Sequence, residues 1–199
     1  MNLEIKRYVL GDFETNTYIL NFKEQNKAII IDPADLLPKE IRDLNIIFIL
    51  LTHGHIDHIK GLKYLKGIKV FCFKEEADII KNPFYNLSHF LGEEFSFESE
   101  LNFLNEGVNS VEGIDFRVLH TPGHTPGSCC FLFNNFLFSG DTLFYRSIGR
   151  TDIPLADTTK LINSIKEKLF KLPPETKVYP GHGQFTSIKE EIEENPFLL

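Results

Sequence analysis

The sequence is poor in the residues and runs that mark secreted and membrane proteins. Its 199 residues include three cysteines, one methionine and no tryptophan. Two of the cysteines, Cys129 and Cys130, are adjacent, which is awkward for disulfide pairing, so we expect a reducing, cytoplasmic compartment. No stretch approaches 18 consecutive apolar residues, so we expect no membrane-spanning helix and no membrane partner. Residues 1–7 alternate and carry frequent charges, which predicts a strand and not a signal peptide.

Basic charge is also scarce. The chain has 21 Lys and Arg against 28 Asp and Glu, a formal net charge of −7. Nucleic-acid-binding domains usually present a basic stripe. We therefore expect no nucleic-acid partner.

The pattern of strands and helices indicates one mixed α/β domain covering residues 1–199. A chain of this length can bury about 70% of its extended surface. Predicted strands cover 3–10, 15–22, 27–31, 46–51, 68–73, 116–120, 128–133, 136–139 and 177–179. Predicted helices cover 57–66, 74–81, 158–172 and 187–194, with a short helical turn in 38–44.

A cluster of potential metal ligands follows the apolar run 46–51. A strand that is apolar at every position is buried on both faces, and α/β folds hold ligands at the carboxyl ends of such strands. Within six residues the cluster contains His53, His55, Asp57 and His58. Nitrogen and oxygen donors suit zinc, iron or manganese. Gly54 lets the loop bend tightly, so His53 and His55 can converge on one ion while Asp57 and His58 serve a neighbouring ion.

Two further candidates belong to one predicted hairpin. His124 is flanked on each side by a Pro-Gly pair within 121–127, which predicts a stiff loop. If Asn134 and Asn135 form the hairpin turn, Phe133 faces Phe136. Asp141 then falls at the end of the hairpin that carries His124.

The remaining histidines complete the pattern. His182 lies in another Pro/Gly turn at 179–183. Five imidazoles and two carboxylates on strand-terminal loops suit two metal ions that share Asp141. His120, at the end of a strand, is expected to support its loop by hydrogen bonding, and His89 lies in an aromatic segment with no partner motif.

The pattern H-x-H-x-D-H at 53–58, followed by His124, Asp141 and His182, resembles the metallo-β-lactamase superfamily. The strings 121–128, 138–144 and 147–152 resemble the glyoxalase II group, the hydroxyacylglutathione hydrolases, and also the persulfide dioxygenases. The resemblance implies a four-layer αββα sandwich with the metal site along one edge.

The resemblance also implies a ligand set and a reaction. Two divalent ions are expected, with zinc first and iron or manganese as alternatives. The first ion would be held by His53, His55 and His124, and the second by Asp57, His58 and His182. Asp141 would bridge both ions, and Asp57 and Asp141 are the expected catalytic residues. The reaction would be thioester hydrolysis by a metal-bound bridging hydroxide, and a residual site charge of about +1 suits a small anionic thioester or thiol-derived substrate.

The thiol half of the substrate is less well specified. Arg150 lies where the glyoxalase II group places a basic residue near glutathione, so it is expected to contact a substrate anion. The alternative is a structural arginine that pairs with Asp152 or Asp157. Glyoxalase II proper has a helical C-terminal extension that contributes to glutathione binding, whereas this sequence ends 17 residues after His182. We therefore expect a short form of the glyoxalase II group, and the identity of the thiol in its substrate stays open.

Three other functions stay open. A mononuclear Fe(II) persulfide dioxygenase of the same fold would use His53, His124 and Asp141 as its two-histidine, one-carboxylate face. A binding protein with a vestigial site is disfavoured by the complete ligand set. An RNA-processing enzyme is disfavoured by the acidic charge.

An aromatic-rich insert covers about 84–103. It holds six aromatic residues among several glutamates. Aromatic residues dominate cores and interfaces, so we expect this segment to pack over the sheet edge or contact a second chain instead of forming a lid. The protein would be a monomer or a homodimer.

Overall fold

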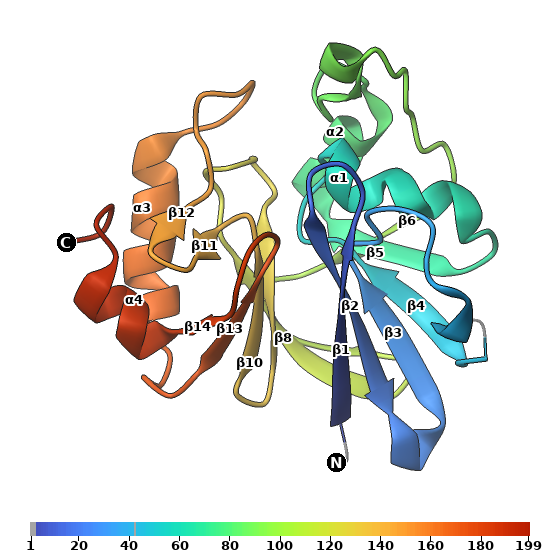
Figure 1. Cartoon of the computed structure of the whole chain (residues 1–199), viewed down its shortest axis with the longest axis horizontal. Coiled ribbons are helices and arrows are strands. Elements are labelled where there is room, and N and C mark those ends of the chain that lie inside the picture. The colour runs from blue at the N-terminus through green and yellow to red at the C-terminus, as the bar shows by residue number, and fades with distance from the viewer. Residues whose placement is uncertain (1–2, 42) are drawn as a thin grey trace.

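Two six-stranded sheets face each other and carry helices on their outer faces (Figure 1). The computed structural model describes residues 3–41 and 43–199. The first half of the chain builds one sheet and the second half builds the other. This is the predicted four-layer αββα sandwich in a single domain.

The first sheet positions the histidine-rich loop. Its strands, in spatial order, are β1 (Leu3–Leu10), β2 (Thr15–Phe22), β3 (Lys27–Ile31), β4 (Ile46–Leu50), β5 (Lys69–Phe73) and β6 (Leu101–Leu104). β1 to β3 are antiparallel, and β3 to β6 run parallel. Parallel neighbours need a crossover. The crossover from β4 to β5 contains the loop of His53 and helix α1 (Ile56–Ile59).

The second sheet positions the other candidate ligands. Its spatial order is β14 (Thr186–Ser187), β13 (Lys177–Pro180), β10 (Phe136–Gly140), β9 (Cys129–Phe133), β8 (Ile114–His120) and β7 (Gly107–Val111). The predicted hairpin is confirmed, because Phe133 pairs with Phe136 and Asn134 adopts a left-handed φ of 54°. β10 pairs in parallel with β13, so the chain leaves both strands at the same edge.

The layer between the sheets is largely aromatic. Its fully buried members include Tyr18, Phe22, Phe48, Phe131 and Phe138. Several rings meet edge to face, such as Tyr18 and Phe138 with centroids 5.1 Å apart. This layer, and not the 84–103 segment, takes up much of the phenylalanine of the chain.

Helices bury the outer face of each sheet. Ile56 and Ile59 of α1, together with Ile80 of α2 (Ala77–Lys81), pack on the first sheet. α3 (Thr158–Glu167) and α4 (Ile188–Glu194) pack on the second sheet. Among the described residues no helix is both long and apolar enough to cross a bilayer.

Helix lengths differ from the sequence prediction at three places. The helix predicted over 74–81 is a 3-10 helix, Lys74–Glu76, followed by the short α2. The helix predicted over 57–66 is one α-turn, α1, followed by a 3-10 helix over Lys60–Tyr64. The backbone N–H of Gly61 donates to the carbonyl of Pro33 at 2.8 Å, so it cannot continue the α-helical ladder. The helix predicted over 158–172 likewise ends at Glu167 and tightens into a 3-10 turn, Leu169–Lys171.

The aromatic segment divides into a packed part and an exposed part. Phe95 and Phe97 pack against the outer core of the first sheet, as predicted. Phe84 and Phe90 remain exposed, and residues 101–104 become strand β6, which the sequence did not predict. In Figure 1 this green segment rises beside α1 and α2 at the upper edge of the sandwich.

Candidate metal centre

Seven side chains from separate loops meet at one edge of the sandwich, where α1 lies in Figure 1. The loop after β4 and helix α1 supply four of them, the β8–β9 loop supplies one, and the ends of β10 and β13 supply two. They are His53, His55, Asp57, His58, His124, Asp141 and His182. The structure therefore brings together every residue that the sequence proposed as a metal ligand.

The seven residues form three overlapping groups. In each group the potential ligand atoms lie within 4.8 Å of one another. We call His53, His55 and His124 the three-histidine subsite, and Asp57, His58 and His182 the mixed subsite. The third group joins His53, His58 and Asp141. Asp141 therefore lies between the two subsites, as a bridging ligand must.

Burial sets the charge of the three-histidine subsite. Its imidazoles are at most 3% exposed. Burial lowers the pKa of all three rings, that of His55 to about 3, so they are neutral at pH 7. Nδ1 of His124 donates to the carbonyl of Arg150 at 2.9 Å, which leaves Nε2 with its lone pair, 2.9 Å from Nδ1 of His55. Neutral imidazole is the form that binds a metal ion.

The mixed subsite has the opposite electrostatics. Burial opposes a charge on His58, but the carboxylates of Asp57 and Asp141 raise its pKa well above the ordinary value. Burial also opposes a charge on His182, whose hydrogen bonds with Asp141 and Asp57 raise its pKa to about 9. Burial works against ionisation of Asp57, yet His58 and His182 lower its pKa to about 2. Imidazolium–carboxylate pairs thus form this subsite, and their protons must leave as a cation enters.

The buried polar atoms of the centre fit metal ligation. Nε2 of His53 and Nε2 of His55 have no hydrogen-bond partner among the described residues, and Oδ1 of Asp141 makes no hydrogen bond there but lies 3.3 Å from Nε2 of His58. An unpaired buried polar atom costs about 1–3 kcal/mol, so it requires an explanation such as a bound ion. Imidazole and carboxylate donors in this arrangement fit two divalent ions, of which zinc, iron and manganese are the natural candidates.

Asp32 orients one histidine of each subsite, and the sequence analysis missed it. Its Oδ2 lies 2.9 Å from Nδ1 of His58 and accepts a 2.6 Å hydrogen bond from Oγ1 of Thr52. Thr52 Oγ1 is in turn 3.1 Å from Nδ1 of His53. Asp32 has a left-handed φ of 51°, and its carbonyl accepts a 2.6 Å hydrogen bond from Thr17. Asp32 follows directly after the predicted strand 27–31, and this position at a strand end was the usable signal.

Glu76 joins the two loops of the three-histidine subsite. Its carboxylate is fully buried and accepts from the backbone N–H of Gly54 at 2.6 Å and of Gly127 at 2.8 Å. Oγ1 of Thr125 donates to it at 2.5 Å. Burial raises the pKa of Glu76 to about 7, although the hydrogen bonds from these three donors lower it. It lies in a predicted helix with no motif around it, so no sequence signal marked it.

Glycines make room where loops approach the centre. A Cβ on Gly54 would lie 2.9 Å from Cγ1 of Ile80, so close packing as well as the bend requires glycine there. A Cβ on Gly181 would lie 2.2 Å from Oδ1 of Asp141. The backbone N–H of Gly181 donates to the carbonyl of Gly140, which ties the Asp141 and His182 loops together.

The start of β2 holds the His182 loop from the other sheet. The side-chain amide of Asn16 donates to the carbonyls of Pro180 and Gly183. Nδ1 of His182 lies 3.0 Å from the carbonyl of Phe13, so Nε2 faces the carboxylates. Thr15 Oγ1 donates to Asp57 at 3.0 Å. The β1–β2 hairpin therefore fixes the mixed subsite.

The other two histidines lie outside the centre. The ring of His120 stacks on Phe73 with centroids 4.1 Å apart, and its Nε2 lies 2.9 Å from the carbonyl of Pro126. This confirms the predicted support of the Pro-Gly loop. His89 is exposed and pairs with Glu94 at 2.9 Å.

A cavity of about 420 Å³ opens over the metal centre. Five of the seven candidate ligands form its floor, and Phe13 and Arg150 contribute to its wall. Nε and Nη2 of Arg150 contact Asp152 at 2.8 and 2.9 Å. Arg150 therefore lines the cavity and also forms the pair with Asp152 that was the structural alternative, while its contact with a substrate anion stays a prediction.

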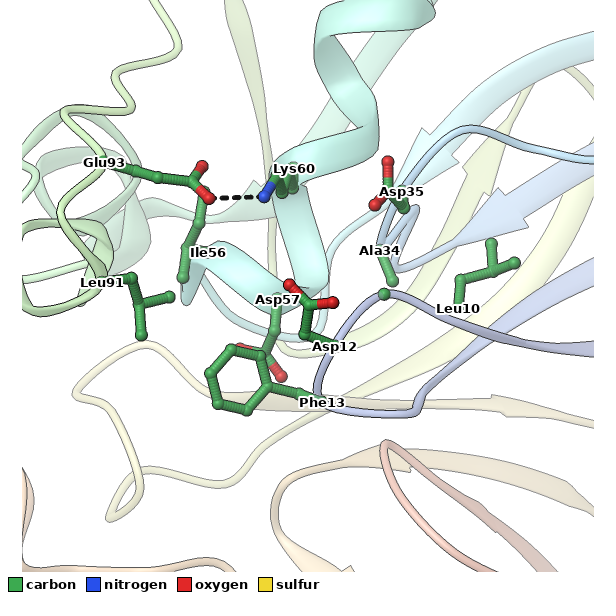
Figure 2. Close-up of a pocket in the computed structure, with 11 residues that line it drawn as sticks. Leu10, Asp12, Phe13, Ala34, Asp35, Ile56, Asp57, Lys60, Leu91 and Glu93 are labelled. Carbon is green, nitrogen blue, oxygen red and sulfur yellow. Dashed lines mark hydrogen bonds and ion pairs between the residues drawn. The ribbon is translucent and has the colours of Figure 1, made fainter.

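A side chamber of about 250 Å³ adjoins this cavity (Figure 2). The two spaces share a wall of Phe13, Ile56, Asp57 and Leu91. The chamber is lined by the carboxylates of Asp12, Asp35 and Glu93, and its one lining cation, Lys60, pairs with Glu93 at 2.5 Å. Figure 2 shows this pair as the bridge between the 3-10 helix that follows α1 and the aromatic segment.

Known proteins match nearly the whole chain. The family model described as the metallo-beta-lactamase superfamily matches residues 10–182. Hydroxyacylglutathione hydrolase GloC of Haemophilus influenzae is 37% identical, over 100% of this chain and 98% of its own length.

Solved structures agree with this match. The crystal structure of BLEG-1 B3 metallo-beta-lactamase has 34% identity and a TM-score of 0.89, over 98% of this chain and 99% of its own. TTHA1623, solved in a di-iron-bound form, has 34% identity and a TM-score of 0.83, over 97% of this chain and 100% of its own. The chain belongs to the metallo-β-lactamase superfamily and resembles the glyoxalase II group within it.

Proposed function

We propose that this protein is a dinuclear metallohydrolase that cleaves thioesters, the class to which hydroxyacylglutathiones belong. The observation that carries the proposal is the position of Asp141 between two complete groups of three ligands. A site for one ion would need neither Asp57 nor His182. The 37% identity to a hydroxyacylglutathione hydrolase supports the same reaction class.

His53, His55 and His124 would hold one ion, Asp57, His58 and His182 the other, and Asp141 both. Divalent ions bound there would lower the pKa of water and polarise a carbonyl group. Zinc is our first expectation, with iron or manganese as alternatives. The residues of the chain position the ions and set the charge around them. Neutral histidines form the three-histidine subsite, and carboxylates contribute to the mixed subsite. An outer hydrogen-bond network from Asp32 fixes the orientation of the rings.

The cavity supports a thioester over an amide. Among the residues that line it, the titratable groups outside the candidate ligands are Arg150 and Asp152, and these two are paired. The cavity therefore offers no spare proton donor for an amine leaving group. A thiol has a pKa near 8.5 and leaves as the thiolate without such help.

The cysteines support a reducing, cytoplasmic compartment, which we propose for the protein. Cys72, Cys129 and Cys130 are buried free thiols. Burial raises the pKa of Cys72 to about 12 and that of Cys130 to about 11, so neither is a thiolate at neutral pH. The metal centre accordingly has nitrogen and oxygen donors only.

A mononuclear Fe(II) persulfide dioxygenase is the second candidate. Iron in TTHA1623 favours the metal of this candidate but not its single ion, because that protein is described in a di-iron-bound form. In this chain Nε2 of His124 and Oδ2 of Asp141 are 3.6 Å apart, beside His53. These three residues would supply two imidazoles and a carboxylate to one iron.

Hydrolysis assays on purified, metal-loaded protein test the proposal. We expect release of free thiol from S-lactoylglutathione or from simpler acyl thioesters, and loss of that activity with a chelator. Failure to hydrolyse any acyl thioester, together with oxygen consumption on glutathione persulfide, would replace the hydrolase with the dioxygenase.

A further inference from the structure

We infer, on the basis of the proposed thioesterase function, that the preferred substrate carries an apolar arm and is not a glutathione thioester. The cavity over the metal centre is lined on one side by the aromatic segment and on another by the loop after β12 (Ser147–Ile148). The apolar side chains concerned are Leu87, Phe90, Leu91, Ile153 and Pro154. In Figure 1 the segment and the loop rise from the two halves of the sandwich at the metal edge.

The apolar wall is exposed to solvent. Phe90 is 60% and Leu91 45% exposed. Large apolar side chains gathered around a cavity mark a binding surface. Covering them with an apolar group removes their surface from water, which is favourable. A small polar acyl group such as lactoyl would leave this wall exposed.

The wall is also rigidly attached to the metal centre. The buried side chain of Asn86 donates to the carbonyl of Phe95 at 2.8 Å and accepts from the backbone N–H of Ser88. The carbonyl of Asn86 accepts from the backbone N–H of Ile56, the residue before Asp57. The pair of Lys60 and Glu93 adds a second attachment to α1. A wall held in this way needs little ordering when a ligand binds.

The charges around the cavity disfavour glutathione, which carries two carboxylates against one ammonium group and is therefore a net anion. The lining cations of the cavity and of the side chamber are Arg150 and Lys60, and each already pairs with a carboxylate, Asp152 and Glu93. Asp12 and Asp35 line the side chamber as well (Figure 2). Outside the metal ligands the lining therefore contains more negative than positive charge. The anionic substrate predicted from the sequence relied on the charge of the ions and on Arg150, whose guanidinium is paired with Asp152.

The first test measures binding with unreactive thioethers, so that it does not depend on hydrolysis. The probes are S-hexyl-N-acetylcysteamine, S-ethyl-N-acetylcysteamine and S-hexylglutathione, titrated calorimetrically into metal-loaded protein. We expect the hexyl compound of the neutral thiol to bind on the order of tenfold more tightly than the ethyl compound, and more tightly than S-hexylglutathione. Equal affinity for the two chain lengths, or tighter binding of S-hexylglutathione, would overturn the inference.

Two variants and one control variant test which residues cause the preference for the hexyl chain and for the neutral thiol. Phe90→Ala should remove most of the chain-length preference, whereas Phe103→Ala, an exposed phenylalanine of β6 away from the cavity, should keep it. Asp152→Asn frees the guanidinium of Arg150 and should raise affinity for S-hexylglutathione several-fold. A chain-length preference unchanged in Phe90→Ala would refute the assignment to this wall. Absence of thioester hydrolysis, with the binding preference intact, would instead refute the proposed reaction.

Discussion

The two halves of the metal centre use the same kind of ligand in opposite electrostatic states. The three-histidine subsite is almost fully buried, and burial keeps its rings neutral. The mixed subsite is partly open, with His182 29% exposed, and carboxylates hold its rings in the protonated form. One half is therefore ready for a cation, whereas the other must first lose protons.

This difference predicts unequal affinities. A neutral, buried subsite binds an ion without proton release, and the first ion should enter there. Binding in the mixed subsite is linked to proton release and should weaken as pH falls. Asp141 couples the halves, because it lies within 3.6 Å of a ring of each.

The largest expected effect comes from removing the residue that the halves share. Asp141→Ala should lower kcat/KM for thioesters on the order of 10³-fold or more, because it deprives both ions of a ligand and metal catalysis contributes several kcal/mol. Steady-state kinetics with metal analysis measures this. A variant that keeps both ions and most of its activity would remove Asp141 from the bridge.

A matched pair of variants separates the halves. His124→Ala should remove the ion from the three-histidine subsite, and His182→Ala should remove the ion from the mixed subsite. Each variant should lose more than about 100-fold of its activity, because the replaced residue is a proposed ligand and not an outer hydrogen-bond partner. Elemental analysis should find about one ion per chain in each variant. Full occupancy in either variant would show that the assignment of that ligand is wrong.

Proton release gives the next effect. Loading of the mixed subsite should release protons below pH 9, because the pKa of His182 is raised to about 9 and that of His58 lies well above its ordinary value. Its affinity should fall about tenfold per pH unit for each proton displaced, while the three-histidine subsite changes little. Calorimetry in buffers of different ionisation enthalpy measures the protons. Equal release at the two steps would contradict the assigned charges.

Asp32→Asn should weaken both subsites at once. It removes the acceptor that orients His58 directly and His53 through Thr52. Loss of such an outer partner typically lowers metal affinity by about 10- to 100-fold. Competition with a chelator measures it, and an effect confined to one subsite would show that the shared network is not what positions both rings.

Glu76→Gln should act on stability more than on the metals. It replaces an acceptor of three hydrogen bonds with a group that has its own donors, at a cost of about 1–3 kcal/mol in the free energy of unfolding. In the native chain the pKa of Glu76 is raised from 4.5 to about 7 by burial, so its contribution to stability is fully present below pH 4.5 and is lost as pH rises through 7. Denaturant unfolding should show that the free energy of unfolding of the native chain falls over this pH range. The same decline should be absent in Glu76→Gln. An identical pH profile in the two proteins would refute the role of Glu76.

The sequence predicted the candidate ligands that the structure brings together and missed the residues that orient them. His53 to His58, His124, Asp141 and His182 were recognisable because tight Pro/Gly loops and strand ends concentrate chemistry at fixed spacings. Asp32 and Glu76 had no such motif around them, because their partners lie 15 or more residues away and only the packed sheets bring them together. The helix over 57–66 was predicted too long for a similar reason, since the Gly61 N–H bonds to Pro33 in another loop.

The cavity wall was harder still to predict. The aromatic segment was expected to pack or to form an interface, and Phe95 and Phe97 do pack. No periodicity distinguishes these residues from Phe90, which lines the cavity. Patterns repeated over many strands predicted a mixed α/β domain, whereas the αββα sandwich followed only from the family resemblance carried by the ligand motifs.

The most direct test of a two-ion hydrolase is a titration of the metal-free protein with zinc, following thioester hydrolysis at each added equivalent with oxygen excluded. The account predicts little activity after the first equivalent and a maximum at two ions per chain. Full thioesterase activity with one ion per chain would contradict it, as would activity that requires iron and oxygen.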